Sequence, residues 1–315
     1  MPMKSRRKVL MILTHDRFDC LRLCLEMLEK ANAFAAFDHV VLLLNGVPAR
    51  LRRYVQQFMA ARPQVRWDTV DGDGTRPGGI CAVQNECIRR YPDSIYVKVD
   101  EDVFVPTGWA ERMLATYERY QDRTDLALIT TLIPNNAYGL HRLLTTFYPE
   151  KLPEFERLFG APPSAAAKGP TWQRPDIAEW ATRLFLDLEA ANEEQRRRLA
   201  ASDQPRWHEF CQYFSIGCIC YDYAHVQRMG GALPPRDEPD WCAWFEEKKH
   251  ICVLDQSMVV LHYSFFVQQD WLDRSTLLED IRARNLPGTS PWYAAGARWW
   301  RLARQVPRIL KRRLA

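Results

Sequence analysis

Apolar and polar positions alternate along the first part of the chain in a regular way. Strand-length apolar runs, each closed by polar or turn-forming residues, occupy 8–15, 39–46, 64–70 and 94–100. Amphipathic segments with apolar side chains at helical spacing lie between them at 19–31, 49–61 and 80–91. Strand–helix repeats of this length predict parallel strands joined by right-handed crossovers, and therefore a doubly wound α/β sheet flanked by helices.

The second part of the chain is less regular. An apolar run at 125–133 predicts another strand, and 141–210 is a mostly polar segment that predicts a helical insertion. Residues 211–270 return to strand-like runs, at 214–222 and 250–265, separated by a short helix and a glycine-proline turn. We therefore expect one domain over 1–297, followed by a C-terminal segment, 298–315, of different character.

Composition favours a folded protein without a membrane span. The chain is 47% hydrophobic and 26% charged, and no apolar run approaches the ~20 residues that cross a bilayer. The basic start is followed by an apolar stretch too short for a secretory signal, which leads us to expect a cytoplasmic protein. Nine cysteines, an odd number at irregular spacing, fit free buried thiols better than disulfides or a zinc site.

Charge is distributed unevenly. The net charge is +4, yet residues 1–8 hold four basic side chains and residues 298–315 hold seven, with no acid in either segment. The body between them is therefore acidic, which argues against a nucleic-acid binder and for an anionic partner of the ends.

The C-terminal segment 298–315 alternates basic residues with apolar ones, among them Trp299, Leu302, Val306 and Leu314. This pattern predicts a basic amphipathic helix that rests on an anionic membrane. An alternative is a helix that packs Trp299 and Trp300 on its own domain, and Pro307 would kink either helix.

Three consecutive acids, Asp100, Glu101 and Asp102, end the strand at 94–100. The carboxyl edge of an open α/β sheet is where ligands bind. Two carboxylates separated by one residue can converge on one hard cation such as Mg²⁺ or Mn²⁺. The alternative is a solvated turn whose acids pair with Lys98 or Arg112.

Four stretches, "LTHDR", "LLNG", "GGICAVQNECI" and "VKVDEDVFVP", together resemble glycosyltransferases of the GT-A fold, closest in pattern to family 2. The resemblance covers about residues 8–130 clearly and 210–265 more loosely. It implies a nucleotide-sugar-binding half at 8–130, an acceptor and catalytic half at 211–270, and a DxD motif that holds a divalent metal on the donor diphosphate.

Carried over residue by residue, the resemblance makes Asp102 the direct metal ligand. Asp100 would bind ribose or metal, and Glu101 would be structural. His262, after a late apolar strand, would be a further ligand of the Mn²⁺ or Mg²⁺, although a lone histidine can equally be a packed residue. The nucleotide pocket would contain residues that follow the first three strands: Thr14, His15, Arg17, Asn45 and Asp71. Asp71 also suits an ordinary turn.

A second acidic group lies in "RDEPDWCAWFEEKKH", where the family often has an acidic pair followed by tryptophan. The resemblance makes Asp240 the candidate general base, with Asp237 and Glu238 as alternates, because Pro239 departs from the family pattern. An acidic helix start explains the same residues without catalysis.

These features predict a metal-dependent glycosyltransferase that moves a sugar from a nucleotide diphosphate sugar to an acceptor hydroxyl, with inversion. A UDP-sugar is favoured by family frequency, and the acceptor could be a glycan, a lipid-linked molecule or a protein. One alternative is a sugar nucleotidyltransferase, whose glycine-rich first loop is missing from "LTHDRFDC". Another is a catalytically inactive nucleotide-sugar-binding module.

Overall fold

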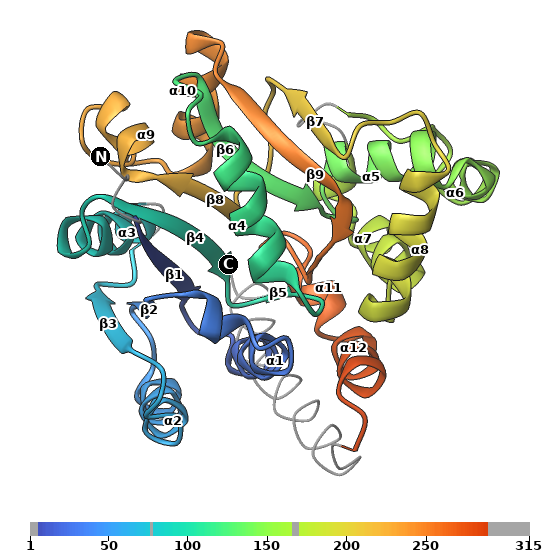
Figure 1. Cartoon of the computed structure of the whole chain (residues 1–315). Helices are drawn as coiled ribbons and strands as arrows, with labels where there is room; N and C mark the ends of the chain where they lie inside the picture. Colours follow the sequence, from blue (N-terminus) through green and yellow to red (C-terminus); the bar gives the residue numbers. More distant parts are fainter. Residues whose placement is uncertain (1–5, 76–77, 166–169, 289–315) are drawn as a thin grey trace, which may run out of the picture.

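The computed structural model describes residues 6–75, 78–165 and 170–288. Its centre is an eight-stranded sheet with the strand order β3-β2-β1-β4-β8-β6-β9-β7 (Figure 1). In chain order these strands are β1 (Arg7–Thr14), β2 (His39–Asn45), β3 (Trp67–Gly72), β4 (Ser94–Asp100), β6 (Leu126–Leu132), β7 (Trp207–Phe210), β8 (Cys218–Asp222) and β9 (Ile251–Val259).

The predicted parallel α/β sheet is confirmed. Strands β1, β2, β3 and β4 pair in parallel, as do β6 and β9. The connecting helices lie where the pattern predicted them, at α1 (Phe18–Lys30), α2 (Ala49–Ala60) and α3 (Gly78–Arg90). Two strands run the other way: β8 is antiparallel to β4 and β6, and β7 is antiparallel to β9. Apolar periodicity reports burial but not strand direction, so the pattern could not show this.

The remaining helices surround the sheet (Figure 1). They are α4 (Trp109–Tyr120), α5 (Ala137–Arg142), α6 (Leu152–Phe159), α7 (Pro175–Leu184), α8 (Leu188–Ala200), α9 (Tyr223–Arg228), α10 (Glu238–Lys248), α11 (Gln269–Leu272) and α12 (Leu277–Asn285). Short helical turns occupy η1 (Ala33–Ala36), η2 (Leu143–Phe147), η3 (Pro149–Lys151) and η4 (Pro170–Trp172).

The expected helical insertion at 141–210 contains α6, α7 and α8. Together with Leu140 of α5, its residues Leu144, Phe155, Ile177 and Ala181 form a small separate apolar core. The insertion ends in β7, which pairs with β9 and forms the edge strand of the main sheet.

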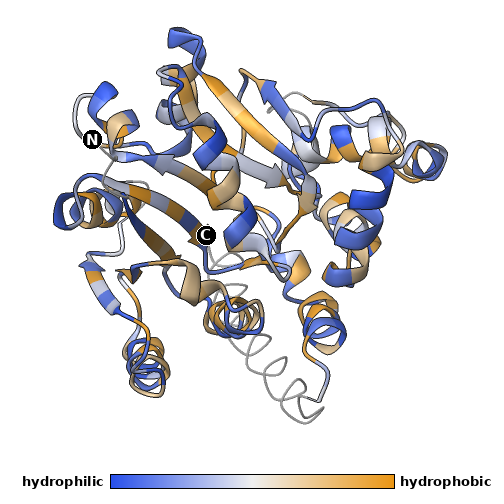
Figure 2. Cartoon of the chain, viewed as in Figure 1, coloured by the Kyte–Doolittle hydropathy of each residue, from blue (hydrophilic) through white to orange (hydrophobic). Residues whose placement is uncertain are grey.

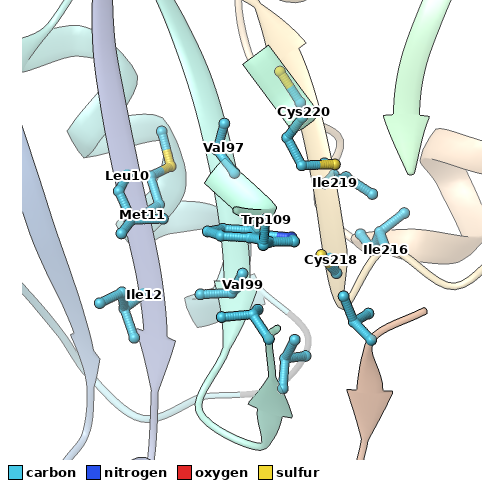
Figure 3. Packing of buried hydrophobic residues seen from close by; sticks show 14 of the residues in the cluster. Leu10, Met11, Ile12, Val97, Val99, Trp109, Ile216, Cys218, Ile219 and Cys220 are labelled. Atoms are coloured by element: carbon cyan, nitrogen blue, oxygen red, sulfur yellow. The ribbon is translucent and has the colours of Figure 1, made fainter. Parts of the chain in front are cut away.

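The main core lies where helices cover the middle strands, in which successive apolar residues are buried, as in parallel strands covered on both sides. Figure 2 shows apolar residues along these strands. The Trp109 ring of α4 lies across β4 and β8 near Val97, Val99 and Cys218 (Figure 3). All nine cysteines are free as predicted, and all except Cys211 are buried. In the described part of the chain, no helix is long and apolar enough to cross a membrane.

A second, two-stranded sheet forms at the carboxyl end of β4. It pairs β5 (Val103–Phe104) antiparallel with β10 (Leu261–His262), with His262 opposite Val103. The Tyr263 backbone N–H donates to the Asp102 carbonyl over 2.8 Å. This pairing brings together, at the end of the acidic motif, two segments that lie far apart in the sequence.

Candidate active site

Asp102 and His262 face each other in this small sheet. His262 Nε2 lies 3.4 Å from Asp102 Oδ1, and both side chains are almost fully buried. Burial alone would raise the pKa of Asp102, but the charges of His262 and Arg17 lower it to about 2. Burial alone would lower the pKa of His262, and the Asp102 carboxylate raises it instead. The two side chains that the resemblance makes ligands of one metal ion therefore contact each other as a carboxylate–imidazole pair.

Arg17, expected in the nucleotide pocket, lies beside Asp102 instead. One guanidinium nitrogen pairs with Asp102 Oδ2 and donates to Ser264 Oγ over 2.8 Å. The other lies 3.4 Å from Asp273 Oδ1, and the guanidinium carbon lies 5.0 Å from the centre of the Tyr263 ring. Arg17 is therefore the buried counter-ion of the proposed metal ligand.

Asp100 has a cation of its own. Lys98 Nζ lies 2.6 Å from Asp100 Oδ1 and donates to the Ile216 carbonyl over 3.0 Å. Burial alone would lower the pKa of Lys98, but the Asp100 charge raises it. The alternative interpretation was a solvated turn whose acids pair with Lys98 or Arg112. The pair with Lys98 is present, but the turn is not solvated, because Lys98, Glu101 and Asp102 are buried.

Gly217 lies against both Asp100 and His262. A Cβ atom on Gly217 would lie 3.2 Å from Asp100 Oδ2 and 3.8 Å from His262 Nε2. The Gly217 carbonyl also accepts from the Asp100 backbone N–H over 2.9 Å. A larger residue at position 217 would therefore crowd Asp100 and contact His262.

The oxygen and nitrogen atoms of the side chains near Gly217 suit a divalent metal ion. Asp100 and Asp102 supply carboxylate oxygens and His262 an imidazole nitrogen, a set that Mn²⁺ accepts and Mg²⁺ accepts in part. The buried Nδ1 atom of His262 has no hydrogen-bond partner within the described ranges. In those same ranges, no three His, Cys, Asp or Glu side chains lie close enough together to form a complete metal site.

The Glu101 carboxylate accepts hydrogen bonds from the end of β1 and the loop that follows it. The donors are the Thr14 hydroxyl (3.2 Å) and the backbone N–H groups of His15 (3.1 Å) and Arg17 (3.4 Å). Burial raises the pKa of Glu101 to about 7, against the lowering effect of Arg17. These contacts agree with the structural role expected for the middle acid, and they hold Thr14 inside the protein.

Two residues expected at the nucleotide pocket lie together. His15 Nδ1 is 2.5 Å from the Asn45 carbonyl oxygen. The Asn45 side chain accepts from Gly74 N over 3.0 Å and donates to the Thr75 carbonyl over 3.2 Å. Gly46, at φ +67°, allows this because a Cβ there would lie 2.3 Å from Gly74 Cα.

Asp71 stands apart from these residues. Its side chain is exposed and lies 2.6 Å from the Arg52 guanidinium. The structure therefore brings His15 and Asn45 together at the ends of β1 and β2 and leaves Asp71 at the surface.

The acids of the second motif separate at the start of α10. Glu238 accepts from the Tyr213 hydroxyl over 2.5 Å and from the Ile216 backbone N–H over 3.0 Å, and burial raises its pKa. Asp237, at φ +56°, lies near Gln84 Nε2 (3.5 Å).

Asp240 instead pairs with Arg236 at 2.6 Å, and the hydrogen bond from Arg236 lowers the pKa of Asp240. Glu238 is thus bonded to the residue beside Gly217, whereas Asp240 faces outward.

Several residues of this site were not predicted. Gly217 carries a recognisable signal, since a glycine inside an apolar run often marks close backbone approach. No such sequence signal marks Tyr213, Ser264 or Asp273, because each contacts the site through residues far away in the sequence.

No protein-family model matches the chain, and neither does any curated protein sequence. Solved structures do. A mannosyltransferase, PcManGT, from Pyrobaculum calidifontis in complex with GDP-Man and Mn²⁺ is 13% identical, with 97% of this chain and 76% of that chain covered and a TM-score of 0.48.

GalNAc-T7 with UDP, GalNAc and Mn²⁺ is 10% identical over 89% of this chain and 48% of that chain, with a TM-score of 0.49. TarS residues 1–349 from S. aureus is 9% identical over 95% of this chain and 71% of that chain, with a TM-score of 0.42. The chain thus spans about half of the GalNAc-T7 chain. At these identities and TM-scores the likeness is a distant one of fold, and it carries no argument about function.

Proposed function

We propose that this protein is a metal-dependent glycosyltransferase that moves a sugar from a nucleotide diphosphate sugar to an acceptor hydroxyl with inversion. The observation that carries the proposal is that Asp102 contacts His262, and that Gly217 lies against both Asp100 and His262, at the carboxyl edge of the sheet. Glu238 is bonded to the neighbouring Ile216. A proton acceptor is thus bonded to the residue next to Gly217, and Gly217 itself lies against Asp100 and His262.

Asp100, Asp102 and His262 would hold Mn²⁺ or Mg²⁺, which, when bound, supplies positive charge opposite the leaving diphosphate. The chain's own cations prepare these ligands. Arg17 keeps Asp102 ionised, and Lys98 lies against Asp100. Because Ser264 and Asp273 hold Arg17 in turn, the carboxylate is positioned before any ligand arrives.

Glu238 is the general base we propose in place of Asp240. Burial raises the pKa of Glu238, which makes it a better proton acceptor at neutral pH, while Arg236 already pairs with Asp240. In the reaction the acceptor oxygen attacks the anomeric carbon and the bond to the diphosphate oxygen breaks. The proton of the acceptor hydroxyl passes to Glu238, and the configuration of the sugar inverts in this single displacement. Asp237 is the alternate base.

The nucleotide would lie over the ends of β1 and β2, where His15 and Asn45 converge. Uridine remains the favoured base by family frequency alone, and Asp71 would join the pocket only by breaking its pair with Arg52. A cytoplasmic location, and contact with an anionic membrane through 298–315, also remain proposals. The latter segment lies outside the described residues.

The test is donor binding followed by transfer. UDP-, GDP- and dTDP-sugars are titrated calorimetrically into the full chain with and without Mn²⁺, and the anomeric configuration of any product is determined by NMR. We expect one nucleotide class to bind only with the metal. Binding without hydrolysis or transfer would instead favour an inactive binding module, and no metal-dependent binding of any nucleotide sugar would refute the proposal.

A further inference from the structure

An aromatic surface lies next to the candidate active site. Within the described ranges, three of the four exposed large apolar side chains fall between 266 and 271. Phe266 is 73% exposed and Trp271 is 50% exposed. The Trp172 ring lies 6.5 Å from that of Phe266. We call Trp172, Phe266 and Trp271 the aromatic surface.

The backbone under this surface is held in place. Gln268 is fully buried, accepts from the Phe265 backbone N–H over 3.1 Å and donates to the Thr171 carbonyl over 3.1 Å. The Trp271 indole N–H donates to Glu179 over 3.2 Å. The rings are thus presented to solvent by a fixed turn, although leaving a large apolar side chain exposed forgoes stabilisation.

Residues next to the aromatic surface along the chain contact the candidate active site. Phe265, next to Phe266, packs its ring 4.8 Å from that of His262. On the other side, Asp273 follows Trp271 by two residues and pairs with Arg17, the counter-ion of Asp102. The segment that presents these rings is thus the same one that contacts His262 and Arg17.

The charged residues near the aromatic surface indicate which kind of molecule binds there. The charges of this rim are mixed and paired, as in Arg174 with Asp176 and Arg183 with Glu179, so it lacks the basic excess that attracts an anionic membrane. Three side chains are also far fewer than the roughly 20–30 residues per partner that a stable dimer buries. A sugar ring fits better, because its C–H face packs on the electron-rich face of an aromatic ring while its hydroxyls bond to polar neighbours.

We propose, on the basis of the function proposed above, that the aromatic surface binds saccharide units of the acceptor, so that the acceptor is a glycan of several sugars. Sugars remote from the reacting hydroxyl stack on Trp172, Phe266 and Trp271. Binding energy from these remote units holds the terminal hydroxyl near Glu238.

The test uses the full chain and a panel of neutral α- and β-linked oligosaccharides, with affinity measured by calorimetry and contact by saturation-transfer NMR. Phe266→Ser and Trp271→Gln are compared with Leu158→Ser, which removes an apolar side chain that is 45% exposed on α6. We expect at least one oligosaccharide to bind, to lose tenfold or more in affinity in the two aromatic variants, and to be unaffected in Leu158→Ser.

Equal affinity in all variants would overturn the inference, and so would a panel in which nothing binds. Loss of binding to phosphatidylcholine or phosphatidylglycerol vesicles, or loss of self-association, as the only effect of the aromatic variants would assign the surface to a membrane or a second copy instead. Asp102→Asn separates the two proposals, because it should abolish donor binding and leave oligosaccharide affinity intact. If no nucleotide sugar binds the wild type while oligosaccharides still require the rings, the catalytic proposal fails and the surface stands.

Discussion

Lys98 and Asp100 form an ion pair within the sheet, with Nζ 2.6 Å from Oδ1 and only 1% of the lysine exposed. Residues two apart on a strand point to the same face, so β4 itself sets this pair. The lysine also faces the charges of Asp237 and Glu238. One buried cation thus lies between the acidic motif and the proposed base, and the site depends on it for charge balance.

Lys98→Met should be strongly destabilising, because it leaves Asp100 without its cation in a buried setting. Breaking a buried pair from one side costs about 3–5 kcal/mol. The double variant Lys98→Met/Asp100→Asn should be less destabilised than the sum of its singles, as measured by urea unfolding. Lys8→Met, which loses a more exposed pair with Glu118, is the matched control on β1. Additive losses in the double variant would show that the pair contributes nothing.

Asp102→Asn should abolish Mn²⁺-dependent donor affinity in calorimetry, since it removes a proposed ligand oxygen. It should also lower Tm, because Arg17 keeps its charge but loses a buried partner. His262→Ala should likewise weaken metal binding first. Glu86→Gln, whose carboxylate pairs with Arg89 and Arg90 at the surface, should change neither quantity. Unchanged donor affinity in Asp102→Asn would remove this residue from the metal site.

Glu238→Gln should bind the nucleotide sugar and Mn²⁺ with near-normal affinity yet turn over at least ~100-fold more slowly, the lower scale for losing a general base. Asp240→Asn should keep most of its turnover, because its carboxylate is turned toward Arg236. Initial rates and donor affinities are measured on both variants and on Asp237→Asn. A large loss confined to Asp240→Asn would restore Asp240 as the base.

His225 should make stability depend on pH. It is buried against Trp241, whose indole N–H donates to its Nε2 over 2.9 Å, and burial lowers its pKa from 6.5 to about 3. Below pH ~6.5, His225 therefore binds a proton in the unfolded chain but not in the folded chain. The free energy of unfolding is thus highest above that pH and falls as the pH decreases. The loss from this group should reach about 2 kcal/mol at pH ~5.

Urea unfolding of the wild type and of His225→Gln between pH ~7 and ~5 checks this. The variant should show a shallower decline, because glutamine still accepts from Trp241 but does not titrate. Parallel pH profiles for the two proteins would mean that His225 is not responsible.

Truncation after Gly296 should reduce binding to anionic vesicles without harming transfer to a soluble acceptor. The removed segment includes the seven basic residues of 298–315, each worth about 1 kcal/mol near an anionic surface at low salt. Co-sedimentation with phosphatidylglycerol vesicles at rising salt measures the effect. If the full-length chain does not bind such vesicles, residues 298–315 do not form a membrane-binding segment and have a structural role only.

Local patterns were enough to predict the α/β sheet and the acids at its edge. The period of apolar side chains distinguishes strands from helices over a few residues, and a run such as Val9–Ile12 must be buried wherever the strand lies. The position of Asp100 at a strand end follows from the same short stretch. These features depend on neighbours along the chain, so sequence alone contains them.

The partners of those acids depended on pairings between distant segments. Antiparallel β8 enters between β4 and β6 and brings Gly217 to Asp100, and β10 pairs with β5 and brings His262 to Asp102. Glu238 and Asp240 are two positions apart at a helix start, where side chains do not share a face, so the two carboxylates have different partners. Only the packing of α10 brings Glu238 to Ile216 and Tyr213. Arg17 lies at Asp102 because Ser264 and Asp273 converge there, and no periodicity along a chain encodes such long-range contacts.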